Sequence, residues 1–185
     1  MRLFTVATVI TLLAAPAGAD EISDTLEAAL EAYRAGDIAL AKEELDYAGQ
    51  LLSQLKAQGL TGFLPAPLDG WEKSEPSTQA AGAAMFGGGL LAEATYSNGA
   101  SEIGLRLMAD NPMVVAMGTA FGNAALMGAM GEVRRINRQK LIVTPEGDVQ
   151  ALINGRVMVQ IEGDGSTEDK LSYFEALDIE GLKSF

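Results

Sequence analysis

The stretch VQALINGRVMVQIE, residues 149–162, decides the fold of this chain. Its centre is the dipeptide Asn154-Gly155, and runs rich in valine and isoleucine stand on both sides. Asparagine followed by glycine favours the tight turn of a β-hairpin, because both residues tolerate positive φ. We therefore predict strands at 149–153 and 157–162 that pair antiparallel.

The same signals recur upstream of this hairpin. Apolar residues alternate with polar ones on both sides of Asn98-Gly99, which supplies another turn signal. The further strands that we predict cover residues 92–96, 101–108, 132–136 and 140–144. A closing helix follows Ser166, which forms with Asp169 a pattern similar to a capping box. Short strands joined by tight turns predict an α+β domain, an antiparallel sheet with helices packed on one face.

The N-terminal part, residues 20–59, has the apolar spacing of a helical hairpin. The first helix is expected to carry one apolar face, made of Ile22, Leu26, Ala29, Leu30 and Tyr33. Gly36-Asp37 interrupts it, and a second helix is expected at about 38–58. The apolar set of that helix is Leu40, Ala41, Leu45, Ala48, Leu51, Leu52 and Leu55.

Residues 28–48 resemble a single tetratricopeptide-type unit, in which a glycine permits the turn and small residues permit close helix packing. Such units stack to bury their apolar faces, and no second copy is visible in the sequence. The hairpin must therefore pack on the following domain, on a second copy of itself, or on a partner protein. Tyr33 is a candidate contact residue.

A change of composition at residues 60–75 predicts a linker before the α+β domain, residues 76–185. Pro65, Pro67 and Gly70 prevent a continuing helix. The only tryptophan, Trp71, follows this turn. It could form a platform for a ligand, but we favour the interpretation that it fastens the linker to the core.

Residues 1–19 read as a cleaved signal peptide, with Arg2, an apolar run and the small residues Ala17-Gly18-Ala19. The apolar run is too short to span a bilayer, so we expect no transmembrane segment after cleavage. The chain is therefore expected in the periplasm, or secreted beyond it. Without cysteine there is no thiol to acylate and no disulfide.

The composition argues against several classes of function. The chain has 13 Lys and Arg against 25 Asp and Glu, a net charge of −12, which disfavours binding to nucleic acid or anionic lipid. It contains neither histidine nor cysteine, the usual groups for proton transfer at neutral pH and for nucleophilic attack. We expect no enzyme, no cofactor and no metal site.

Residues 111–131 carry no charge and begin with a proline suited to a first helical turn. One helix here would place on one arc four methionines, Met113, Met117, Met127 and Met130. Thioethers bind Cu(I), but methionine more often fills gaps in a core. We expect a buried core helix.

Residues 80–89, AAGAAMFGGG, lack the lysine and the strand–loop–helix setting of a phosphate-binding loop. We favour an irregular start of a strand. A second hypothesis is a lid, with Met85 and Phe86, over an apolar pocket that Met117 also lines; the chain would then be a periplasmic small-molecule or lipid-binding protein.

The only basic cluster consists of Arg134, Arg135, Arg138 and Lys140. It could receive a carboxylate or an acidic partner. In so acidic a chain, we expect these side chains to pair with the protein's own acids.

The order of three motifs resembles a group of uncharacterised secreted proteobacterial proteins. These motifs are FLPAPLDGW at 63–71, AAGAAMFGGG at 80–89 and ADNPM at 109–113. The resemblance implies an N-terminal helical segment, a small α+β domain and a periplasmic location, and it carries no catalytic or binding residues. The resemblance supports a location and no mechanism. The unstacked hairpin, whose apolar face needs a cover, favours a non-enzymatic interaction or accessory protein.

Overall fold

The computed structural model describes residues 17–79 and 89–185. Residues 1–16 of the predicted signal peptide, and Met85 and Phe86, lie outside the described residues. The chain divides into two compact units, the first ending at Leu52 and the second beginning at Ser53. The predicted linker, 60–75, belongs to the second unit.

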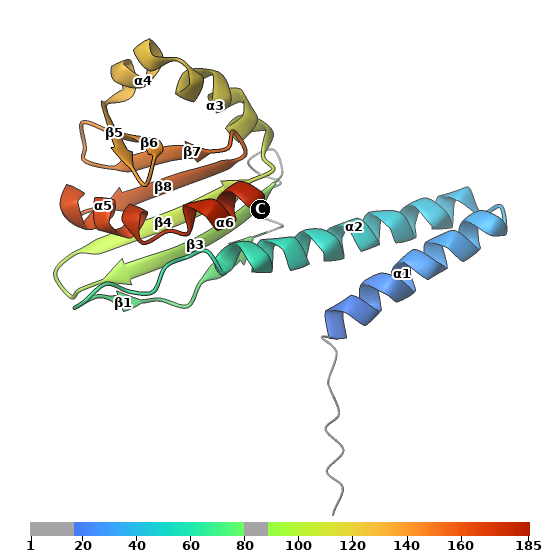
Figure 1. The fold of residues 1–185 in the computed structure, drawn as a ribbon. Helices are drawn as coiled ribbons and strands as arrows, with labels where there is room; N and C mark the ends of the chain where they lie inside the picture. The colour runs from blue at the N-terminus through green and yellow to red at the C-terminus, as the bar shows by residue number, and fades with distance from the viewer. Residues whose placement is uncertain (1–16, 80–88) are drawn as a thin grey trace, which may run out of the picture. The chain divides into compact units, whose positions relative to one another are not determined.

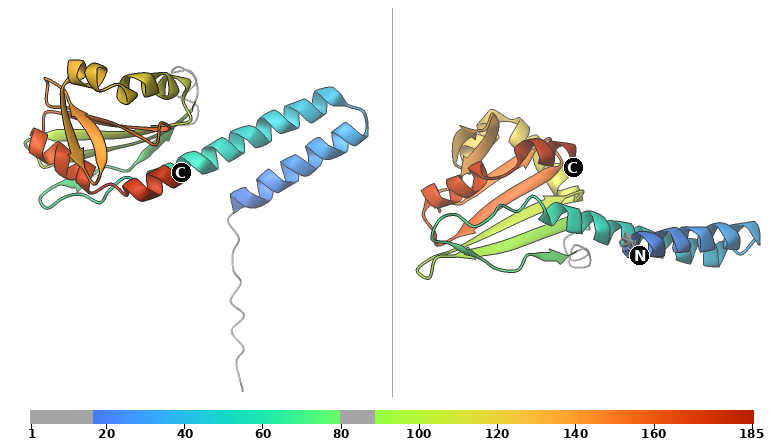
Figure 2. Two further views of the ribbon diagram at one scale, coloured as in Figure 1. Left: turned by 45° about the horizontal axis from the view of Figure 1, so that its top comes forward. Right: turned by 60° about the horizontal axis from the view of Figure 1, so that its bottom comes forward.

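The first unit is a helical hairpin. Helix α1 (Ala17–Arg34) and helix α2 (Ile38–Thr61) run antiparallel (Figures 1 and 2). Gly36 turns the chain with a φ of +83°, a value that glycine adopts without strain. The carboxylate of Asp37 then accepts a hydrogen bond of 3.0 Å from the Leu40 amide in the first turn of α2.

Small side chains form the contact between the two helices. The buried residues are Ile22, Thr25, Ala29 and Ala32 of α1 with Ala41 and Ala48 of α2. Leu26, Leu30 and Tyr33, which the apolar spacing groups with Ile22 and Ala29, are exposed. Alanines let the helix backbones approach closely, and apart from Ile22 the larger side chains lie beside the contact.

The second unit is built on an antiparallel sheet, which confirms the predicted α+β class. Its strands follow the order β1-β3-β4-β8-β7-β6-β5, and β2 also pairs with β3. The strands are β1 (Glu72–Lys73), β2 (Ser77–Gln79), β3 (Leu90–Ser97), β4 (Glu102–Ala109), β5 (Glu132–Ile136), β6 (Gln139–Val143), β7 (Val149–Ile153) and β8 (Val157–Gly163).

Helices α5 (Thr167–Glu175) and α6 (Ile179–Ser184) cover one face of this sheet (Figure 1). The main core lies between them and alternate strand residues such as Leu105, Val159 and Ile161. The hydroxyl of Ser166 accepts a hydrogen bond of 3.1 Å from the Asp169 amide, which confirms the predicted cap of α5. The opposite face carries a smaller apolar cluster of Val114, Leu152 and Met158.

Residues 111–131 do not form the single buried helix that we predicted. They form α3 (Pro112–Gly122) and α4 (Ala124–Met130), bent by 104° at Asn123. The Asn123 side chain accepts a hydrogen bond from the Ala125 amide and so caps a new helix. Within 111–131 only Asn111, Val114 and Met127 are buried. The break also removes the common arc of four methionines.

Asp110 joins three parts of the second unit. Its carboxylate accepts hydrogen bonds from Lys56 Nζ of α2 at 2.5 Å and from Arg156 of the β7–β8 turn at 3.2 Å. The hydrogen bond from Lys56 is the main cause of a pKa below the ordinary 3.8. Because the folded-state pKa is lowered, the pair stabilises the fold above pH 3.8, and this contribution is lost as the pH falls through the lowered pKa.

We therefore expect Asp110→Asn to lower the free energy of unfolding by about 1 kcal/mol at neutral pH, since both ion pairs are partly solvated. Asparagine keeps the positive φ of 51° that this position requires. Urea denaturation at several pH values would measure the difference, which should shrink as the pH falls below 3.8. Asp46→Asn is the control, because Asp46 forms an exposed ion pair with Lys42 on a single helix. An equal loss in both variants would contradict the prediction.

Candidate protein-interaction site

The hairpin exposes large apolar side chains on its outside. Tyr33 is 65% exposed and Ile38 is 61% exposed, at opposite ends of the turn. The other exposed large apolar residues of the first unit are Leu26, Leu30, Leu40, Leu45, Tyr47 and Leu52. Full burial of one such side chain contributes about 1.5–3 kcal/mol. A large part of the apolar surface of the hairpin is therefore exposed and does not contribute to the contact between its two helices.

Most of these side chains lie on one side of the hairpin. Successive residues of a helix are rotated by about 100°. On α1, one sense of rotation about the helix axis leads from the buried alanines to the side chains of Leu26, Leu30 and Tyr33. On α2, the same sense of rotation leads from the buried alanines to the side chains of Ile38, Leu45 and Leu52. Because the two helices are antiparallel, equal rotations from their contact lead to the same side. We call these six residues the apolar hairpin face.

The opposite side of the hairpin is marked by a polar contact. Tyr47 and Glu21 both turn in the other sense from the buried alanines, and the Tyr47 hydroxyl donates a hydrogen bond of 2.7 Å to the Glu21 carboxylate. This hydrogen bond raises the pKa of Tyr47. The contact joins α1 to α2 and confirms that equal rotations reach one side. Leu40 also lies on this side, and it is exposed.

The predicted site residues separate in the structure. Tyr33 belongs to the apolar hairpin face. Trp71 is buried, and its ring meets that of Tyr173 edge-on at 5.8 Å, so it packs on the core as we favoured. Met117 of α3 packs against the small cluster on the other face of the sheet. Met85 and Phe86 lie outside the described residues.

The sequence prediction included Leu45 and Leu52 in the apolar set of the second helix but did not include Ile38. A signal was nevertheless present, because these three residues are spaced by seven. That spacing brings side chains back to nearly the same side of a helix. A separate row of alanines, Ala41 and Ala48, has the same spacing and forms the buried contact.

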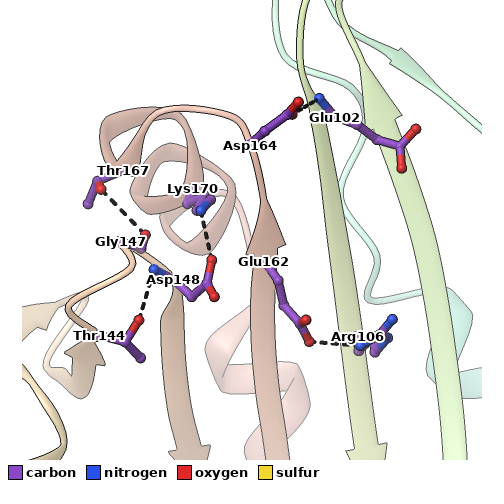
Figure 3. A network of polar contacts seen from close by, with 9 residues as sticks. All are labelled: Glu102, Arg106, Thr144, Gly147, Asp148, Glu162, Asp164, Thr167 and Lys170. Atoms are coloured by element: carbon purple, nitrogen blue, oxygen red, sulfur yellow. Dashed lines mark hydrogen bonds and ion pairs between the residues drawn. The ribbon is translucent and has the colours of Figure 1, made fainter.

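Several polar groups of the second unit pair with one another (Figure 3). Arg106 donates hydrogen bonds to Glu93 at 3.1 Å and to Glu162 at 2.7 Å. Burial by itself lowers the pKa of Arg106, because it disfavours the charged form. The two carboxylates outweigh this effect and raise the pKa above its ordinary value. Lys170 donates to Asp148 at 2.7 Å. Such paired groups hold neighbouring strands and helices together.

Within residues 17–79 and 89–185, no group of three or more acidic side chains is placed to hold a metal ion. In the same residues, no single helix is long and apolar enough to cross a membrane. The bent pair α3 and α4 meets that test by length and composition.

Known protein families, curated proteins and solved structures were compared with this chain, and none of them matches it.

Proposed function

We propose that this chain is an exported, non-enzymatic accessory protein that binds a protein partner through its apolar hairpin face. The observation that carries the proposal is the position of the large side chains. Alanines form the contact between α1 and α2, while Leu26, Tyr33 and Leu45 stay exposed on one side.

The chemistry of this face suits a protein partner. A flat apolar strip on two antiparallel helices matches the face of another amphipathic helix or helix pair. The strip is about 21 Å long on α2, from Ile38 to Leu52, because a helix rises 1.5 Å per residue. The net charge of −12 disfavours anionic lipid as the alternative occupant.

Site-specific photo-cross-linking in intact cells tests the proposal. A photo-reactive amino acid at Tyr33 should capture a protein, whereas the same group at Leu40, on the other side, should capture none. Leu45→Ser should reduce the capture at Tyr33 by about tenfold, because a buried leucine contributes 1.5–3 kcal/mol.

Leu40→Ser is the matched control, since it removes an exposed leucine from the same helix. It should leave the capture at Tyr33 unchanged. Capture of a second copy of the chain at Tyr33 would identify the partner as the protein itself. Equal capture from Tyr33 and Leu40, or equal effects of the two serine variants, would contradict the proposal.

A further inference from the structure

The hairpin of β5 and β6 carries cations that face one another. Arg135 and Lys140 are directly opposite in the antiparallel register. Both are exposed. Like charges at directly opposite positions destabilise a strand pair. A neutral partner at either position would remove this repulsion, so the arrangement is not one that stability alone favours.

The register brings these two side chains especially close. Ile136 pairs with Gln139 across the two-residue turn Asn137-Arg138. The pair next to such a turn exchanges hydrogen bonds, and bonded and non-bonded pairs alternate along the hairpin. Arg135 and Lys140 therefore form a non-bonded pair, in which opposite residues approach to about 4.5 Å between their Cα atoms.

The turn adds a third cation. Arg138 has a φ of +64°, a conformation in which glycine is preferred. The β7–β8 turn of the same sheet places Gly155 at a similar φ of +69°. An arginine at this position costs of the order of 1 kcal/mol. The β5–β6 hairpin thus keeps its charge in spite of both repulsion and backbone strain.

We predicted that this cluster pairs with the protein's own acids, and the structure contradicts that for most of it. Arg134 forms an ion pair of 2.9 Å with Glu132. Within the described part of the chain, Arg135, Arg138 and Lys140 form no ion pair with an acidic side chain. The chain has 25 acidic residues, yet among residues 17–79 and 89–185 none of them forms an ion pair with these three cations.

Strand β5 also offers a free edge next to these cations. In the strand order of the described residues it stands last, with β6 as its neighbour. The alternation of bonded pairs directs the main-chain groups of Val133 and Arg135 away from β6. The side chain of Val133 is 43% exposed. Edge strands often carry a charged side chain that prevents pairing with another chain. This protective role does not explain the cluster, because one charge on the edge suffices and Lys140 lies on β6, which is not the edge strand.

We infer that the β5–β6 hairpin binds an acidic, extended segment of another protein. The segment adds as a strand beside β5 and bonds to the main-chain groups of Val133 and Arg135. Its carboxylates lie near Arg135, Arg138 and Lys140 and relieve the repulsion between them. An apolar side chain of the segment contacts Val133. This site is separate from the apolar hairpin face and does not depend on it.

A blocked peptide of alternating glutamate and valine is the probe, and fluorescence anisotropy with the full mature chain measures its binding at low salt. Lys140→Glu should weaken binding by about tenfold or more, because it replaces one cation by an acid at the site. The same variant should raise the denaturation midpoint, because an opposite-charge pair replaces a like-charge pair. Lys42→Glu, on the helical hairpin, changes the net charge equally and should leave the affinity within about twofold.

Strand addition has its own signature. A peptide with proline in place of the central valine should not bind, because proline lacks the amide hydrogen. Hydrogen exchange should slow at Val133 and Arg135 when the unmodified peptide is present. Absence of peptide binding, or equal weakening by Lys140→Glu and Lys42→Glu, would overturn the inference. Lys140-dependent binding of inorganic phosphate or phosphatidylglycerol vesicles in place of the peptide would overturn it too.

Discussion

Asp148→Ala should lower the free energy of unfolding by about 3 kcal/mol. Lys170 lies in α5 and is 1% exposed, and its Nζ is 2.7 Å from the Asp148 carboxylate (Figure 3). Removing the carboxylate leaves an ammonium group buried without a counter-charge. The cost of such a group exceeds the modest net contribution of the intact pair. Urea denaturation, followed by circular dichroism, measures the change.

The variant Lys170→Met removes the ion pair without leaving a buried unpaired charge. Its free energy of unfolding therefore separates the cost of the unpaired ammonium group from the loss of the pair itself. Methionine fills the same space without a charge, and Asp148, whose side chain is 29% exposed, can be hydrated. We expect this variant to lose about 1 kcal/mol or less. The double variant Asp148→Ala with Lys170→Met should recover most of the stability lost by Asp148→Ala. If the double variant were the least stable of the three, the explanation by a buried unpaired charge would be wrong.

Gly163→Ala should destabilise the protein by about 3 kcal/mol. Gly163 ends β8 and pairs with Ile103 of β4. Its φ is +124°, which side chains rarely allow. A Cβ atom at this position would also overlap the carbonyl oxygen of Glu102, which is backbone and cannot rotate away. Both strands would have to separate locally. Thermal and urea denaturation measure the effect.

Gly104→Ala is the matched control for that substitution. Gly104 lies in β4 of the same sheet, and an added Cβ would meet no atom within 4 Å. We expect a change of about 0.5 kcal/mol or less. A similar loss in both variants would show that the sheet responds to the removal of any glycine, and the argument from backbone overlap would fail.

The sequence predicted most of the sheet, because its signals are local. Alternation of apolar residues and the turn at Asn154-Gly155 are read over a few neighbouring residues. The cap of α5 at Ser166 is local in the same way. Residues 111–131 were misread because apolar composition indicates burial only on average. Asn123 acts as a cap there, so one predicted helix became two.

The candidate surfaces were only partly visible in the sequence. Tyr33 was selected as a candidate contact residue, whereas its neighbours on the apolar hairpin face, Leu26 and Leu45, were assigned only to the apolar sets of their helices. Periodicity shows that side chains share a side of a helix, but it does not show which of two apolar rows meets the neighbouring helix. Burial showed that the alanines hold that contact.

By itself the sequence determined the class of the fold, the two helices of the hairpin and the turns between strands, since these follow from residues close together in the chain. Tertiary structure alone decided which row of the hairpin is buried, that Lys170 meets Asp148, and that Arg135 faces Lys140. These contacts depend on packing and on strand register. Both bring together groups that are far apart in the sequence or whose spacing along the chain does not show that they meet.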